Sequence, residues 1–133
     1  MNNVSFIILY DDDKRILMQH RNSDAPTSPN HWGFFGGGIK EKETSSQAVI
    51  REAYEELEIE LENPRLFYEE YVNIKNKEHT NFYFIEKIKD KSKIVLHEGQ
   101  EMKWIFPNEI EKLLAKSYVK KVMKIIENEL QKI

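Results

Sequence analysis

Residues 37–59 read GGIKEKETSSQAVIREAYEELEI, and this stretch combines glycines, an apolar helical pattern and a cluster of glutamates. Apolar side chains recur in it at helical spacing, which predicts a helix over 45–57 that packs one face on a core. That face consists of Val49, Ile50, Ala53 and Leu57. Three glutamates, Glu52, Glu55 and Glu56, fall on the flank beside this face because about 100° separates successive residues of a helix.

The acidic flank has two open interpretations. Six glutamates lie between residues 52 and 62, and Arg51 is the nearest base before Arg65. Like charges three or four residues apart cost a helix only roughly 0.2–0.5 kcal/mol per pair, so a merely solvated acidic face is tolerable. Clustered carboxylates are also the ligands that hard divalent cations prefer. The helix alone does not choose between these two interpretations.

Length and composition limit the function classes. The 133 residues predict a single domain, 1–133, with one buried core. The absence of cysteine excludes disulfides and thiolate metal sites. A net charge of −3 gives no broad basic field for long nucleic acid, so a polyphosphate substrate needs neutralisation from another source. No apolar run reaches the ~18 residues of a membrane span, and the start, MNNVSFIILYDDD, lacks a basic region and a cleavage site, so we expect a cytoplasmic protein without membrane contact.

Strand and helix patterns follow one another along the chain. Runs rich in β-branched and aromatic residues predict strands at 4–10, 15–21, 65–74, 80–89 and 101–106. Further helices are predicted at 108–115, opened by Pro107, and at 118–130, where the apolar positions have helical spacing. The order of strands, a helix, strands and then helices predicts an α+β domain with a mixed sheet.

Six charged or glycine positions in residues 37–59 share one spacing, G-x5-E-x7-R-E-A-x-E-E-L-E-I. They are Gly37, Glu43, Arg51, Glu52, Glu55 and Glu56. This spacing resembles the Nudix box, whose family pattern is G-x5-E-x7-R-E-U-x-E-E-x-G-U, with U a bulky aliphatic residue. Ala53 is smaller than that aliphatic residue, and Glu58 replaces the glycine that closes the helix. Glycine takes a left-handed conformation cheaply, so Glu58 is expected to cost about 1 kcal/mol or to end the helix differently.

The resemblance implies a Nudix αβα sandwich, with the mixed sheet between the box helix and the terminal helix. It also implies hydrolysis of a diphosphate linkage in a nucleoside diphosphate that carries a further group. Mg²⁺, or Mn²⁺ in its place, is the implied cofactor, because bound cations neutralise the pyrophosphate and lower the pKa of a water nucleophile. The implied metal ligands are Glu52 and Glu56, with Glu55 as a further ligand or catalytic bridge and the carbonyl of Gly37 completing the shell.

Two supporting residues follow from the same resemblance. Arg51 is implied to pair with Glu43 and so to orient the loop and the helix, a supporting catalytic task; the alternative is an ordinary surface ion pair. The segment LHEGQEMKW (96–104) resembles the part of MutT-type enzymes that contributes a glutamate to the metal site. That alignment selects Glu98 as a catalytic acid and metal ligand, with Glu101 as the second choice and a plain surface loop as the alternative.

Substrate recognition is predicted in outline. Arg21 resembles in position a phosphate-contacting arginine of MutT-type members. Phe34, just before the glycines, is a candidate to stack on a base, with core packing as its alternative.

The chain begins directly with its first strand, which favours a compact, MutT-like hydrolase. A nucleoside triphosphate, such as 8-oxo-dGTP, is the expected substrate, with monophosphate and pyrophosphate as products. A nucleotide-sugar or other nucleoside-diphosphate-X hydrolase and a non-catalytic nucleotide sensor remain as alternatives, and the chain is expected to be a monomer or a homodimer.

Overall fold

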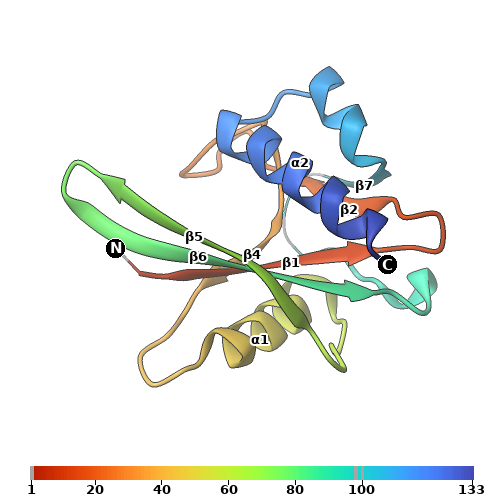
Figure 1. Cartoon of the computed structure of the whole chain (residues 1–133), viewed down its shortest axis with the longest axis horizontal. Helices are drawn as coiled ribbons and strands as arrows, with labels where there is room; N and C mark the ends of the chain where they lie inside the picture. The colour runs from red at the N-terminus through yellow and green to blue at the C-terminus, as the bar shows by residue number, and fades with distance from the viewer. Residues whose placement is uncertain (1, 98, 100) are drawn as a thin grey trace.

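A mixed sheet lies between two helices, with α1 on one face and α2 on the other (Figure 1). The computed structural model describes residues 2–97, 99 and 101–133. The strands are β1 (Val4–Tyr10), β2 (Ile16–His20), β3 (Trp32–Gly33), β4 (Phe35–Gly38), β5 (Arg65–Ile74), β6 (Lys77–Lys87) and β7 (Glu101–Ile105). The helices are α1 (Ser45–Leu57) and α2 (Ser117–Gln131), with short 3-10 helices η1 (Lys91–Lys93) and η2 (Pro107–Lys112). The predicted α+β class and the αβα sandwich are confirmed.

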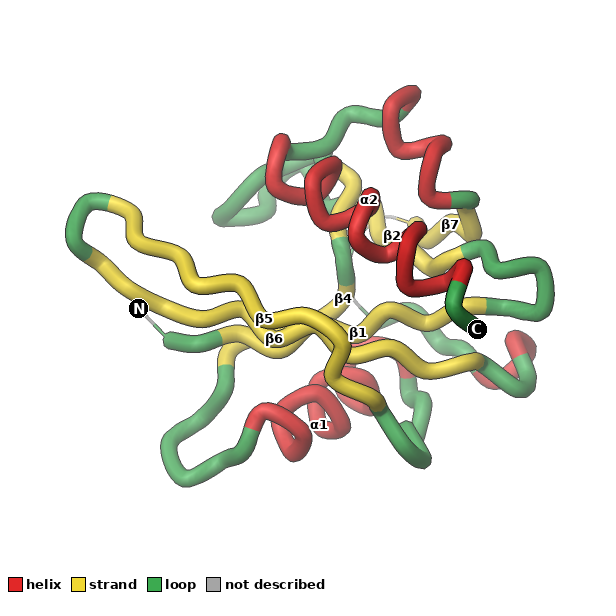
Figure 2. The backbone as a smooth tube through the Cα atoms, in the orientation of Figure 1, coloured by secondary structure: helices red, strands yellow, loops and turns green. Residues whose placement is uncertain are grey.

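The strand order brings a glycine-rich strand beside the centre of the sheet. The order is β3-β2-β1-β6-β5, with β1 and β6 parallel and the other pairs antiparallel. β4 pairs with the first half of β1, from Val4–Gly38 to Ile7–Phe35. β7 pairs along the whole length of β2. β5 and β6 form a long hairpin whose tip extends beyond the rest of the sheet (Figure 2).

The core has two halves because successive residues of a strand point to opposite faces of the sheet. In β1, Ile7 and Leu9 face α1 and pack with its buried residues, whereas Ile8 faces α2. The α1 half includes Val49, Ala53, Leu57, Phe35 and Phe84, and the α2 half includes Met18, Tyr83, Val122, Met123 and Ile126. Both helices are therefore held by their apolar stripes, as the helical periodicity predicts.

Helix α1 begins and ends where the sequence predicts, and its two ends are closed differently. Thr44 is the N-cap, and its side chain and that of Gln47 each bond the other's backbone amide, which forms a capping box. Glu58 follows the last turn with φ 55° and ψ 30°, so a glutamate adopts the left-handed conformation that glycine usually takes there. Ile50, expected on the buried face, is 41% exposed, so the apolar stripe is narrower than predicted.

Two element boundaries lie three residues from the predicted positions, and the other predicted boundaries differ by at most two residues. The helix predicted over 108–115 is a 3-10 helix that ends at Lys112, since the next residues extend and Leu114 O accepts the amide of Trp32 at 2.8 Å. The strand predicted from residue 80 begins at Lys77 because Lys75 and Asn76 form a tight two-residue turn with φ of 52° and 65°.

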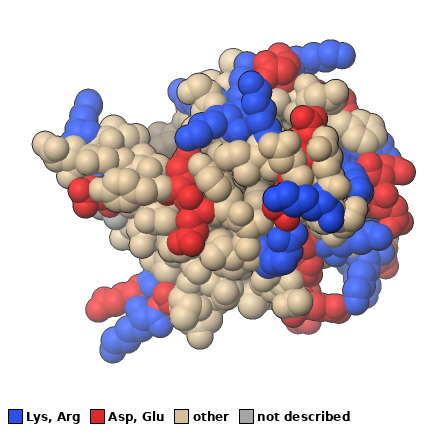
Figure 3. Space-filling view, viewed as in Figure 1, with Lys and Arg blue, Asp and Glu red and all other residues tan. Residues whose placement is uncertain are grey.

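Charged side chains of both signs lie on the surface (Figure 3). Lys and Arg side chains are interspersed with Asp and Glu on the face shown in Figure 3. Within the described residues, no helix combines the length and the apolar character needed to cross a membrane.

Candidate active site

The carboxylates of α1 meet the backbone of the glycine strand β4. Glu56 is 3% exposed, and its Oε2 accepts a 3.2 Å hydrogen bond from the Gly36 amide. Gly36 has φ +154°, and an added Cβ there would run into the backbone of β1. An added Cβ at Gly37 would overlap the carboxylate of Glu52. The missing side chain of Gly37 therefore lets the Glu52 carboxylate lie against the main chain of β4, and the missing side chain of Gly36 lets β4 approach β1 closely.

Arg51 joins the carboxylates of the box to one another. Its Nε and Nη2 donate to the two carboxylate oxygens of Glu43 at 2.8 and 2.9 Å. Its Nη1 donates to Glu52 Oε1 at 2.8 Å and to Glu55 Oε2 at 3.3 Å, and Nη2 also reaches the carbonyl of Gly38 at 2.9 Å. The expected Arg51–Glu43 pair is present, and the same guanidinium also holds two of the predicted metal ligands.

This network changes the titration of its members. The hydrogen bond from Arg51, aided by the Lys40 amide, lowers the pKa of Glu43 from 4.5 to about 2. The bonds to Glu43 and then to Glu52 raise the pKa of Arg51 above its usual range. Because the pKa of Glu43 is depressed on folding, the pair contributes stability above about pH 4.5 and loses it as the pH falls towards about 2. The pair is therefore fully charged at neutral pH.

The other predicted site residues lie in different surroundings. Arg21 lies at the end of β2, where Nε donates to Thr27 O at 2.8 Å, and it lines a polar hollow of about 350 Å³ together with Gln19 and Gly99. Phe34 is 4% exposed in the α2 half of the core, with edge-on ring contacts to Phe6 and Tyr83, so its ring offers no open face to a base. Its position therefore matches the alternative of core packing.

The two acids proposed outside the box have separate outcomes. Glu98 lies outside the described residues. Glu101 begins β7 opposite His20, with its side chain 64% exposed and 3.9 Å from His20 Nδ1. Within the described part of the chain, Glu101 forms no hydrogen bond or ion pair with the carboxylates of α1 or with β4, so its geometry adds nothing in favour of the second choice.

A pocket that the sequence did not predict lies between β1, the β5–β6 hairpin and the start of α2. This hairpin pocket has a volume of about 480 Å³, and its lining includes Phe6, Glu70, Tyr71, His79, Asn81 and Tyr118. Asn81 is 7% exposed, and its Oδ1 has no hydrogen-bond partner among the described residues; the same is true of His79 Nδ1. The available signal was Asn81 itself, a polar residue two positions before the buried Tyr83 and therefore on the same face of β6.

The sequence of this chain matches a known protein family. The NUDIX domain model matches residues 1–124 of the 133. The chain belongs to the Nudix hydrolase family. No curated protein sequence matches the chain.

Solved Nudix structures share this fold at low sequence identity. A MutT protein from Methanosarcina mazei is 17% identical, with a TM-score of 0.82 over 96% of this chain and 94% of that one. An Ap4A hydrolase from C. elegans is 20% identical, with a TM-score of 0.79 and full coverage of both chains. The E. coli dihydroneopterin triphosphate pyrophosphohydrolase is 23% identical, with a TM-score of 0.72 over 91% of each chain. At these identities the likeness shows the fold and not the substrate.

Nudix proteins typically depend on a divalent metal, and the residues of this site fit one. Glu52, Glu55 and Glu56 supply hard oxygen donors from one helix flank, and the Glu52 carboxylate occupies the space that a side chain at Gly37 would fill. Among the described residues, no three His, Asp or Glu side chains already converge as a metal site. Arg51 bonds one oxygen of Glu52 and one oxygen of Glu55, so a cation that binds here shares these carboxylates with the guanidinium or displaces it.

Mg²⁺ is expected to stabilise the fold, because a ligand that binds the folded chain alone shifts the unfolding equilibrium. At a concentration about a hundredfold above Kd, the free energy of unfolding should rise by ~2.7 kcal/mol. Thermal melts in MgCl₂ and in EDTA, with NaCl added to equalise ionic strength, measure this rise. Identical melting temperatures in the two solutions would contradict metal binding at the Glu52–Glu56 flank.

Proposed function

We propose that this chain is a Mg²⁺-dependent pyrophosphohydrolase of nucleoside triphosphates, with Mn²⁺ able to replace Mg²⁺ and 8-oxo-dGTP as a candidate substrate. The observation that supports it most strongly is the arrangement of Glu52, Glu55 and Glu56 on one flank of α1, tied together by Arg51 and set against the backbone of β4. An ordinary solvated helix face needs neither a glycine strand against its carboxylates nor an arginine shared among them.

The reaction is the addition of water to one phosphorus of the triphosphate. The phosphoanhydride oxygen departs with the electron pair of the broken P–O bond, so the products are a nucleoside monophosphate and pyrophosphate. When bound, the cation supplies charge neutralisation and a lower pKa for the attacking water. Glu52, Glu56 and the Gly37 carbonyl are the proposed ligands, and Arg21 is proposed to bind a phosphate oxygen.

The proton of the attacking water needs an acceptor, and Glu55 and Glu98 are the proposed groups. The side chain of Glu55 is 53% exposed and holds the longest of the hydrogen bonds from Arg51, at 3.3 Å. It is therefore the box carboxylate that can most easily turn from Arg51 towards a substrate. Glu98 keeps the role implied by the resemblance.

The hairpin pocket is proposed to hold the nucleoside. Phe6 lines this pocket, and in the β1–β4 register it lies opposite Gly36, whose amide bonds Glu56. The β1–β4 pair therefore separates the pocket from the carboxylates, and the pocket lies on the face of the sheet that α2 covers. A substrate that passes over the glycines of β4 would place its phosphates near the glutamates of α1. Its base would then lie among the aromatic rings of the hairpin pocket, where Asn81 Oδ1 can accept a hydrogen bond.

Asn81→Leu is expected to stabilise the folded chain and to weaken substrate binding. Leucine has a similar volume and removes a buried oxygen that has no partner, so the free energy of unfolding should rise by about 1 kcal/mol. Loss of one hydrogen bond to the substrate should raise KM about fivefold with kcat little changed. Chemical denaturation and steady-state kinetics measure the two effects. An unchanged KM would exclude Asn81 from substrate binding.

Hydrolysis of a nucleoside diphosphate linked to another group is the second candidate. It is favoured by the open side of the hairpin pocket, where Tyr71 is 63% exposed and Tyr118 is 41% exposed, because exposed rings leave room for a second group beside the nucleoside. The chemistry at the carboxylates is the same for both candidates.

A turnover screen with Mg²⁺ tests the proposal. The panel contains the canonical and 8-oxo nucleoside triphosphates, a nucleotide sugar and a dinucleoside polyphosphate. Monophosphate and pyrophosphate from a triphosphate support the leading function, whereas nucleoside monophosphate from a diphosphate-X substrate supports the second. Tight nucleotide binding without turnover of any substrate would overturn both and indicate a sensor.

A further inference from the structure

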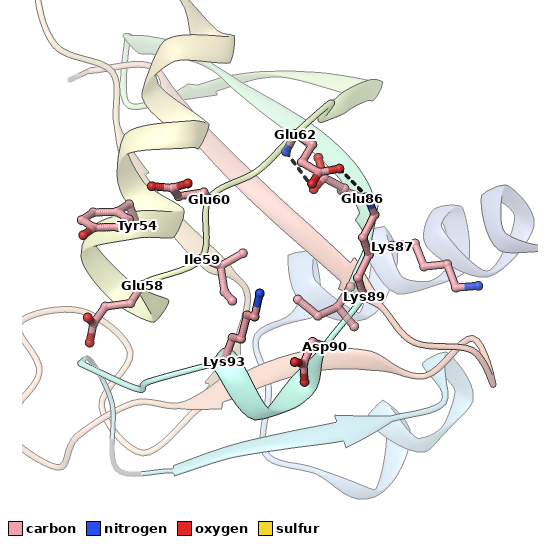
Figure 4. A pocket seen from close by; sticks show the side chains of 11 residues that line it. Tyr54, Glu58, Ile59, Glu60, Glu62, Glu86, Lys87, Lys89, Asp90 and Lys93 are labelled. Atoms are coloured by element: carbon pink, nitrogen blue, oxygen red, sulfur yellow. Dashed lines mark hydrogen bonds and ion pairs between the residues drawn. The ribbon is translucent and has the colours of Figure 1, made fainter.

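Glu58 occupies the end of α1 in a conformation that normally favours glycine, and its carboxylate has a specific partner. The residue has φ 55°, and its Oε2 lies 2.6 Å from His97 Nε2. Figure 4 shows Glu58 at the end of α1, directed away from Glu62 and Glu86 across a hollow of about 350 Å³. The carboxylate therefore engages the 94–97 segment and not the charged groups of β6.

The backbone of the same segment closes the helix. The amide of Val95 donates to Leu57 O at 3.0 Å, and the amide of His97 donates to Glu56 O at 2.8 Å. These carbonyls belong to the last turn of α1, which has no later helical amides to bond. The turn that carries the Glu56 carboxylate is thus bonded through its own main chain to residues 95–97.

The segment is also confined on its other side. Gly99 has φ +86°, and an added Cβ there would lie 2.9 Å from His20 O and 3.0 Å from Gln19 Oε1. Residue 99 therefore packs closely against the end of β2. Residues 95 and 97 are therefore bonded to the end of α1, and Gly99 lies against the end of β2.

We propose that Glu58 and His97 form a latch that positions residues 95–97 against the last turn of α1, and so sets the position of Glu56. The inference rests on the proposed function, because it concerns the alignment of that metal site. Glu58 and His97 are positioning residues and do not touch the reacting atoms. A glycine at position 58 would allow the same helix end but would supply no carboxylate to His97.

Glu58→Gly is expected to remove the latch and to keep the helix cap. Glycine keeps the left-handed conformation without steric cost, so the helix end is retained while the bond to His97 is lost. His97→Ala removes the same bond from the other side. Glu60→Gln is the matched control, because Glu60 is exposed two residues away and loses the same charge without touching His97.

Amide hydrogen exchange of Val95 and His97, measured by NMR without Mg²⁺, reports the latch directly. Both variants should exchange about three- to fivefold faster at these amides, as expected for the loss of one half-exposed side-chain contact, while the control matches the parent. The Kd for Mg²⁺, measured by titration calorimetry, should weaken by a similar factor in both variants.

The outcomes are distinguishable. Unchanged exchange in Glu58→Gly and His97→Ala overturns the latch, and faster exchange with an unchanged Kd for Mg²⁺ overturns its positioning role. A parent chain that binds no Mg²⁺ overturns the proposed function instead, since the exchange measurement does not depend on metal.

Discussion

Replacing Glu56 with glutamine is expected to reduce kcat by about a hundredfold or more while the chain stays folded. Glutamine has nearly the same shape and can still accept the 3.2 Å hydrogen bond from the Gly36 amide, so the packing of α1 on the sheet is preserved. The substitution removes one ligand charge. Stabilisation of the transition state by a bound metal is worth several kcal/mol, and each 1.36 kcal/mol corresponds to about tenfold in rate.

Steady-state kinetics at saturating Mg²⁺, with circular dichroism to confirm folding, measure this loss. Glu41→Gln is the matched control: Glu41 is an exposed acid in the loop between β4 and α1, and its loss should leave kcat unchanged. Activity of Glu56→Gln within about threefold of the parent at saturating Mg²⁺ would show that Glu56 is not a metal ligand, because a lost ligand charge costs more than that.

Helix α1 illustrates what the sequence alone could predict. The apolar spacing of Val49, Ala53 and Leu57 is a local signal, and the helix that it predicts over 45–57 has the bounds that the structure shows. The flank that carries the glutamates follows from helix geometry, so the predicted grouping of the acids needs no tertiary information. The spacing of the Nudix box then indicates the family, to which the domain match assigns the chain.

Features that depend on pairing between distant segments were not predictable in this way. The short helix η2 ends early because residues 113–115 extend towards Trp32, a contact between segments some 80 residues apart in the chain. β2 pairs with β1 at Tyr10–Ile16 and along its whole length with β7, a strand far away in the sequence. Phe34 and Phe35 are neighbours in an aromatic run, and only the pairing of β4 with β1 directs them to opposite halves of the core.

The site shows the same division between local and tertiary information. Its acidic residues are visible in the sequence, but the reach of Arg51 from Glu43 to Gly38 depends on how the 39–44 loop folds back on α1. The hairpin pocket combines strands β1, β5 and β6 with the start of α2, so its lining is scattered through the sequence. The proposed nucleoside pocket depends on tertiary structure. The sequence motif therefore indicates the family but not the base of the substrate.

Arg51→Lys is expected to reduce kcat by about tenfold to a hundredfold, the range typical of residues that orient metal ligands. Lysine keeps the positive charge and the helix propensity, but its single ammonium cannot reproduce the planar fork of the guanidinium. The fork bonds both oxygens of Glu43 while it also holds Glu52, Glu55 and the carbonyl of Gly38. Without it, the loop over 39–44 loses its tie to α1, and the carboxylates lose their common orientation.

Arg15→Lys provides the control, because Arg15 forms a comparable surface pair with Asp13 at 2.9 Å in the turn after β1, away from the glutamates of α1. The control should retain the kcat of the parent. Steady-state kinetics across a range of Mg²⁺ concentrations separate the two origins of a loss in Arg51→Lys: weaker metal binding is restored at high Mg²⁺, and misplaced ligands are not. The geometry of the guanidinium predicts a loss that persists at saturation, since charge is conserved and only orientation changes. If kcat at saturating Mg²⁺ equals that of the parent, the charge of residue 51 is sufficient and its fork has no catalytic role.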